Sequence, residues 1–249
     1  MSCDVLRDLV LSGVQWELAE TPTVLPPKAP TVAQESSATP ASRSQNTIVP
    51  PIAPVQTMSL DTVRSMAMRP TDIESLNRMI VEFNHPLKGA ATNTVLPHAG
   101  QGKMLILTDM PSSDDDATGV ALSGASGELM DKMLAAIGLS RDDVSIVPML
   151  FWRTPGGRSP SAQELELARP FVDRAIELIS PRVILSLGAL PASEYAQINL
   201  AKSHGQPIDM ENGVIFVPIF HPNYLMLKPA AKRDVWTALQ NVQNILKNA

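Results

Sequence analysis

The chain has 249 residues with 25 acidic and 20 basic side chains, which gives a net charge of −5 when histidine is neutral. This acidic balance argues against a protein that holds nucleic acid through a strong basic field, although local basic loops remain compatible with it. Cys3 is the one cysteine, which excludes an intrachain disulfide, a zinc finger and a cysteine-ligated iron–sulfur cluster, and suits a reducing compartment.

Residues 1–20 are the first predicted element, an amphipathic helix. Apolar positions recur at helical spacing from Val5 to Leu18, so one face of residues 4–20 needs a partner surface, on the main domain or on another protein. The segment lacks the basic flank and long apolar core of a signal peptide, and no run in the chain reaches transmembrane length. We therefore expect a cytoplasmic protein that does not bind membranes.

Residues 21–57 are predicted to be a disordered linker. Eight prolines lie there among Ser, Thr, Ala and Gln, and this composition buries too little apolar surface to offset the entropy of the chain. Residues 58–249 are expected to form one domain. Helical patterns fill residues 59–83, with Asp61 as a candidate N-cap, and Pro70 divides them so that Thr71 or Asp72 caps the second helix.

An alternation of apolar runs and helical patterns follows. Four apolar runs are typical of strands buried on both faces: Met104–Leu107, Val144–Leu150, Val183–Gly188 after Pro181, and Val214–Val217. A helical pattern follows each run, in turn Leu129–Ile137, residues 162–179 with a capping box of Ser161 and Glu164, a short helix to Ile198, and Ala230–Leu246. This order predicts an α/β fold, a three-layer α/β/α sandwich around a four-stranded parallel sheet.

The loops after the four strands form the predicted functional edge, because ligands of parallel sheets bind outside the carboxyl ends of the strands. These loops carry Asp109 with Asp114–Asp116, Arg153 with Arg158, Gly188, and His221 with Pro222. A carboxylate, an imidazole and arginines at one rim could orient a water, stabilise a leaving anion and grip a phosphate. Each group also has a structural interpretation: a solvated acidic loop, a turn histidine before proline, and solvated or paired arginines.

Four stretches of sequence resemble the family 4, iron–sulfur-type uracil-DNA glycosylases, over about residues 75–247. In chain order they are NHPLKGAATNTV, TDMPSSDDDATG with LSGASGELMDKMLAAIGL, WRTPGGRSPSAQELELARPFV, and HPNYLMLKPAAKRDVW. The resemblance implies a uracil-DNA glycosylase-like fold. It also implies a DNA-repair protein that hydrolyses the N-glycosidic bond of a flipped-out uracil or related deaminated base.

The resemblance assigns catalysis to Asp109, which would handle the water, and to His221, which would stabilise the leaving base. It assigns binding of the base to Pro111, Leu122, Pro148 and Gly188. Several positions depart from the family's pattern. Asp109 replaces glutamate, Leu122 replaces the phenylalanine that stacks on the base, and Pro148 replaces the asparagine that reads its edge. Thr108 and Ser112 replace glycines of the motif. A catalytically weak or inactive DNA- or protein-binding module is therefore the alternative hypothesis.

The cysteines that hold the family's cluster are absent. His85, Trp152 and Ala168 stand at three of their positions, so we expect no iron–sulfur cluster and no other cofactor, with packing in place of the metal. His85, His98 and His204 also lack the spacing of metal ligands, which predicts no metal site.

Contact with DNA that carries a damaged or deaminated base is predicted to come from Arg153, Arg158 and the stretch after His221. In that stretch Leu225 and Met226 could form an apolar wedge, while the cations Lys228, Lys232 and Arg233 hold phosphates. The alternative is that Leu225 and Met226 belong to the core. We expect a monomer, with residues 4–20 as the candidate surface for a protein partner.

Overall fold

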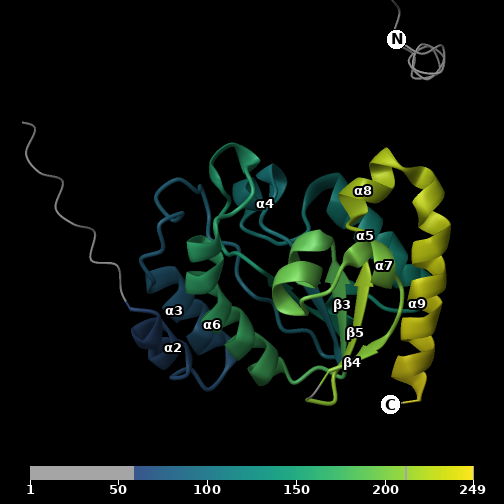
Figure 1. The fold of residues 1–249 in the computed structure, drawn as a ribbon, viewed down its shortest axis with the longest axis horizontal. Helices are drawn as coiled ribbons and strands as arrows, with labels where there is room; N and C mark the ends of the chain where they lie inside the picture. Colours follow the sequence, from purple (N-terminus) through teal and green to yellow (C-terminus); the bar gives the residue numbers. More distant parts are fainter. Residues whose placement is uncertain (1–58, 211, 249) are drawn as a thin grey trace, which may run out of the picture. The chain divides into compact units, whose positions relative to one another are not determined.

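The computed structural model describes residues 59–210 and 212–248, so the expectations for residues 1–20 and 21–57 lie outside the described residues. Its centre is a sheet in the order β2-β1-β3-β5-β4 (Figure 1). Parallel pairing joins β1 (Met104–Thr108), β2 (Val144–Pro148), β3 (Val183–Leu187) and β5 (Ile215–Ile219). The predicted four parallel strands are confirmed.

A fifth strand among the described residues departs from the prediction. β4 (Ile208–Asp209) is antiparallel to β5 and pairs Ile208 with Phe216. Two residues are too few to show the alternation by which a strand is recognised in a sequence. The sheet is therefore mixed at this edge, while the other three strand pairings are parallel.

Helices cover both faces of the sheet, as the three-layer prediction requires (Figure 1). One face packs against α2 (Leu60–Ala67), α3 (Ile73–Glu82) and α6 (Ala162–Ile179). The other packs against α5 (Gly124–Ala136), α8 (Pro222–Leu227) and α9 (Lys232–Lys247). Strand β1 shows why both faces are apolar, since Leu105 and Leu107 enter the first core and Met104 and Ile106 the second.

Short helices occupy the connections between these elements. They are α4 (Ser113–Thr118), α7 (Leu200–Ser203), a π-helical turn at Pro191–Tyr195, and 3₁₀ turns at Arg141–Asp143, Pro155–Gly157 and Pro229–Ala231. The sequence predicted a loop where α4 lies. Among the described helices, none has both the length and the apolar character needed to cross a bilayer.

Local capping follows the sequence with one exception. Ser161 and Glu164 form the predicted capping box of α6, and Asp72 caps α3. The prediction that Asp61 caps the first helix is wrong, because Ser59 accepts the Thr62 N–H there and Asp61 lies in the first turn.

Candidate active site

Asp109, Gly188 and His221 come together at the carboxyl edge of the sheet. They follow β1, β3 and β5, and β3 lies between the other two strands. A Cβ placed on Gly188 would lie 3.4 Å from Asp109 Oδ2 and 3.5 Å from His221 Cβ. Gly188 also has a φ of 93°, a conformation that favours glycine. Its missing side chain therefore leaves the space between the carboxylate and the imidazole open.

His221 is held as a neutral imidazole with one defined tautomer. It is the N-cap of α8, and its Nδ1 accepts the Asn223 N–H at 3.2 Å. An accepting Nδ1 assigns the proton to Nε2, which is then a donor. Burial lowers the pKa of His221 to about 4, against the opposing attraction of Asp115. The turn interpretation is confirmed, because His221 caps α8, and this cap leaves Nε2–H available for the predicted functional role.

Asp109 is fixed through one of its two carboxylate oxygens. Its Oδ1 accepts its neighbour Met110 N–H at 2.8 Å, while Oδ2 faces Gly188. Burial raises the pKa of Asp109, partly offset by that hydrogen bond. A carboxylate with a raised pKa and one uncommitted oxygen can hold a water and accept its proton.

The aspartate run ties three segments together, so the solvated-loop interpretation is wrong for its later members. Asp115 is buried, and its carboxylate accepts the N–H of Ser112 at 3.0 Å and of Ser123 at 2.6 Å. Asp116 Oδ1 accepts the N–H of Thr92 at 2.9 Å and of Asn93 at 3.1 Å. These bonds fix the loop of Asp109 and buried Pro111 against the start of α5.

The two departures in base recognition lie at this same edge. Leu122 is buried with a φ of 55°, and Arg141 holds it there by donating to its carbonyl oxygen at 2.8 Å. Pro148 is the last residue of β2, opposite Thr108, and is buried. Neither side chain supplies an aromatic face or a hydrogen-bonding amide to a base.

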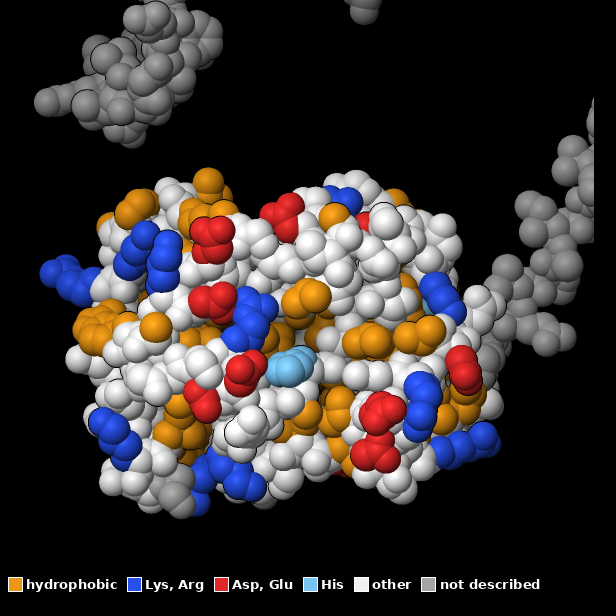
Figure 2. Space-filling view, turned by 180° about the vertical axis from the view of Figure 1, so that it is seen from behind, with side chains coloured by type: hydrophobic (Ala, Val, Ile, Leu, Met, Phe, Trp, Pro, Cys, Tyr) orange, Lys and Arg blue, Asp and Glu red, His pale blue; other side chains and the backbone are white. Residues whose placement is uncertain are grey.

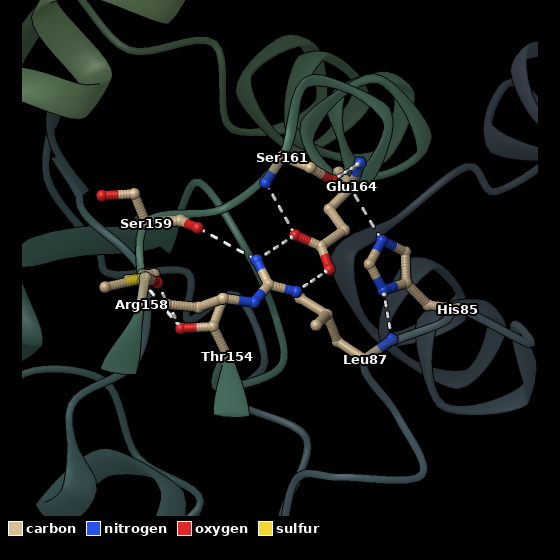
Figure 3. Close-up of polar contacts among 8 residues, drawn as sticks. His85, Leu87, Thr154, Arg158, Ser159, Ser161 and Glu164 are labelled. Atoms are coloured by element: carbon tan, nitrogen blue, oxygen red, sulfur yellow. Dashed lines mark hydrogen bonds and ion pairs between the residues drawn. The ribbon is translucent and has the colours of Figure 1, made fainter. Parts of the chain in front are cut away.

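Arg158 is committed to an ion pair inside the fold (Figure 3). Its guanidinium donates to both Glu164 oxygens, at 2.9 and 2.5 Å, and Glu164 also accepts the Ser161 N–H at 2.7 Å. Arg158 lowers the pKa of Glu164 to about 2. Arg158 therefore has a structural role, while its side chain remains 48% exposed, so the predicted DNA contact by Arg158 stays a prediction. Arg153 differs, since its buried Nε has no partner among the described residues.

The three positions that the resemblance gives to cluster cysteines do not fit a metal. His85 stacks on Trp152 with ring centroids 4.6 Å apart, and Trp152 and Ala168 are fully buried. Both nitrogens of His85 are used, because Nδ1 accepts the Leu87 N–H at 3.2 Å and Nε2 donates to the Glu164 carbonyl at 3.0 Å (Figure 3). No group of three or more potential ligands occurs within residues 59–210 and 212–248. The contacts of His85, Trp152 and Ala168 are those of packed residues, and the absence of a cluster stays a prediction.

The wedge predicted after His221 is shifted along α8. Leu225 is 1% exposed and packs in the core, so its assignment to the DNA surface is wrong. Met226 at 41% and Leu227 at 82% are the exposed apolar residues, beside the exposed cations Lys228 and Lys232. Basic and apolar side chains gather in Figure 2 at the upper left, the corner occupied by α8 and the start of α9.

Two features of the site escaped sequence reasoning. The hydrogen bonds of Asp115 and Asp116 to distant backbone were missed, and the available signal was Ser112 as an N-cap ahead of an acidic first turn. The exposure of Leu227 was missed as well. It depends on how α8 docks on the core, for which a six-residue helix carries little pattern.

Comparison with known proteins agrees with the geometry. A family model described as "Uracil DNA glycosylase superfamily" matches residues 98–241. A type-4 uracil-DNA glycosylase of Thermotoga maritima is 32% identical over 148 residues, which cover 57% of this chain and 76% of the relative. Its counterpart from Archaeoglobus fulgidus is 32% identical over 179 residues, 65% of this chain and 88% of the relative. A DNA polymerase of Bacillus phage SP01 is 26% identical over 151 residues, 59% of this chain and 16% of the relative.

Proposed function

Given that this chain belongs to the uracil DNA glycosylase superfamily, we propose that it is a DNA-repair glycosylase that removes uracil or a related deaminated base from DNA. The observation that carries the proposal is the pairing of Asp109 with His221 across Gly188 at one sheet edge. The type-4 relatives are named for uracil in DNA, and this edge has a carboxylate with an uncommitted oxygen and a neutral imidazole, groups suited to that hydrolysis.

In the proposed reaction the base leaves with the electron pair of the N-glycosidic bond, and a water adds to the sugar carbon. His221 Nε2–H would donate to the oxygen on which the departing base gathers negative charge. One such donor is typically worth about 10²–10³ in rate. Asp109 Oδ2 would hold the water and take its proton, a role that its raised pKa favours.

DNA would be held by α8 and the start of α9. Leu227 and Met226 are exposed apolar side chains that could fill the space left by a flipped nucleotide, while Lys228 and Lys232 bind the flanking phosphates. Arg153 is a candidate for a further phosphate contact, because it is half-buried and follows β2 at the carboxyl edge of the sheet.

A weakly active or silent binding module remains the second candidate function. Leu122 and Pro148 favour it, because an unpaired polar base edge and a missing stacking ring lower both affinity and discrimination. The double variant Leu122→Phe with Pro148→Asn should raise uracil excision if the site is a weakened glycosylase. A silent module would gain no excision from the same change.

We propose that the protein works without an iron–sulfur cluster or other cofactor. The hydrogen bonds on both nitrogens of His85 and the buried Trp152 support this proposal, as does the single cysteine of the chain. Purified protein should be colourless, without broad absorption near about 400 nm, a band expected of cysteine-ligated clusters. Stoichiometric iron and sulfide in fresh protein would contradict the proposal.

Three further expectations are proposals of the same kind. We propose a monomer, a cytoplasmic location consistent with one cysteine, and a protein partner bound through residues 4–20. Light scattering of the full chain tests the first. Loss of a captured partner on deletion of residues 1–20, with DNA binding retained, tests the last.

The direct test of function is a glycosylase assay with single- and double-stranded oligonucleotides that contain uracil, hypoxanthine or xanthine. Slow excision with weak preference for uracil is expected, because Leu122 and Pro148 supply little base recognition. Asp109→Asn should retain part of the activity. Absence of excision from every substrate, together with intact DNA binding, would favour the binding module.

A further inference from the structure

A row of aromatic rings ending in a lysine lies next to His221. The ring centroids of His204 and Phe220 are 4.2 Å apart with planes 28° apart, and those of Phe220 and Tyr224 are 4.7 Å apart and tilted by 36°. Lys228 Nζ lies 5.9 Å from the Tyr224 ring centroid. Neither the Asp109–His221 pair nor the proposed Leu227 wedge uses these rings.

The fold fixes this row from three directions. Phe220 directly precedes His221 at the end of β5 and packs against the core shared by α5, α8 and α9. The loop of His204 is tied to β5, because Gly205 donates its N–H to the Pro218 carbonyl at 2.7 Å. Tyr224 stands one helical turn after His221, whose carbonyl accepts the Tyr224 N–H at 2.9 Å. The outer ring is therefore held at a set distance from the imidazole.

The outer end of the row faces solvent. Tyr224 is 37% exposed, whereas Phe220 and His204 are half-buried. Tyr224, Leu227 and Lys228 have the i, i+3, i+4 spacing of one helical face, and all three are exposed. A ring that only closed the core would be covered like Leu225. Instead α8 presents a ring, an apolar side chain and a cation together at the corner marked in Figure 1.

A ring beside a cation matches the chemistry of a nucleotide, whose base stacks and whose phosphate is an anion. In a duplex, flipping uncovers one face of the neighbouring base, but the proposed Leu227 and Met226 wedge fills that gap and the next base pair covers the other face. Only a base outside a duplex keeps a face open for Tyr224. We propose that Tyr224 stacks on the base next to the flipped nucleotide while Lys228 binds its phosphate, which makes single-stranded DNA the preferred substrate class. This inference rests on the proposed function and names its substrate.

The test is DNA binding by the full chain, measured by fluorescence anisotropy with a uracil-containing strand and the matching duplex, both in the His221→Ala background. Tyr224→Leu should lower affinity for the single strand about tenfold, with little change for the duplex. Tyr224→Phe keeps the ring and should bind as the parent. Trp236→Leu is the matched control, because Trp236 is 41% exposed on α9 in a groove with α5 and should leave single-strand affinity unchanged.

Lys228→Gln adds a second contrast, since both DNA forms carry phosphates and both should bind more weakly. Tyr224→Ser repeats the ring deletion with a polar residue, should Tyr224→Leu lower the melting temperature. The inference would be overturned if Tyr224→Leu and Tyr224→Ser bound single-stranded DNA as tightly as the parent. It would also be overturned if they lost equal affinity for the single strand and the duplex. Excision by the unmodified chain alongside that result would leave the proposed function standing. Absence of binding to either DNA form would defeat both.

Discussion

Two His-Pro pairs in this molecule share one local geometry and differ in what surrounds them. In both, the histidine Nδ1 accepts the N–H two residues ahead, from Leu87 for His85 and from Asn223 for His221, each at 3.2 Å. Burial lowers the pKa of both imidazoles. The Nε2–H of His85 donates to the Glu164 carbonyl at 3.0 Å, whereas that of His221 has no acceptor among the described residues.

The difference shows that a defined tautomer is common and a free donor is what makes a site. Around His85 the space is closed by Trp152, Phe83 and the Arg158–Glu164 pair, so the ring joins segments of the fold together. Next to His221, Gly188 has no side chain, and this leaves room for a substrate atom. The surroundings of His85 and the proposed catalytic edge thus differ: the first is packed, while the second has polar groups beside an open glycine position.

The largest expected effect is on the stability of the packed region around His85. Trp152→Ala should lower the free energy of unfolding by about 3–5 kcal/mol, because it empties a fully buried indole site and removes the stack with His85. Urea denaturation followed by circular dichroism measures the loss. Trp236→Ala is the control, because its side chain is 41% exposed and should cost much less. Similar losses from both variants would mean that the cluster position is not a packed core.

The Arg158–Glu164 pair gives a smaller effect that depends on pH. Arg158→Met should lower the free energy of unfolding at pH 7 by less than Trp152→Ala does, since it removes the cation from the Glu164 carboxylate while half of the Arg158 side chain is exposed to solvent. The folded-state pKa of Glu164, about 2, lies below its ordinary value of 4.5, so the pair stabilises the fold fully above that value. Its contribution is lost as the pH falls from about 4.5 toward 2.

The measurement is urea denaturation of the parent and of Arg158→Met across that pH range. The difference between their free energies of unfolding should become smaller as the pH falls. Arg64→Met is the matched control, because the Arg64–Asp61 pair is 68% and 90% exposed and should contribute under about 1 kcal/mol. A stability difference that stays constant down to about pH 2 would show that Arg158 acts through packing alone.

The smallest expected effect concerns the DNA-binding corner next to His221. Charge reversal at Lys228 and Lys232 should weaken binding and reduce the slope of log affinity against log salt by about 1.5–2, as two phosphate contacts are lost. Anisotropy titrations at several salt concentrations measure the slope. Reversal of Lys88 and Lys103, which lie away from α8 in the sequence, is the comparison. An unchanged slope in the Lys228 and Lys232 variant would remove this corner from the DNA interface.

Much of this arrangement could be predicted, because it depends on short-range pattern and on topology. Apolar runs fixed the four parallel strands, and the rule that ligands bind at the carboxyl ends of strands brought Asp109, Gly188 and His221 together. The capping box of Ser161 and Glu164 followed from spacing alone.

The parts that could not be predicted depend on partners distant in sequence or on how a short helix docks. The Nε2 partner of His85 is 79 positions away, and Asp116 binds backbone 23 and 24 positions away. Leu225 and Leu227 are equally apolar, and only the docking of α8 against the core decides that the first is buried and the second exposed.

The most direct measurement of the central claim is single-turnover excision of uracil from a single-stranded oligonucleotide by the parent, His221→Ala and His85→Ala. The two variants make the same change in the same local motif, so they differ in the environment of Nε2. His221→Ala should slow excision about 10²–10³-fold, and His85→Ala, assayed where it remains folded, should stay within about threefold of the parent. An excision rate for His221→Ala equal to that of the parent or of His85→Ala would contradict the claim that the free Nε2–H of His221 drives the reaction.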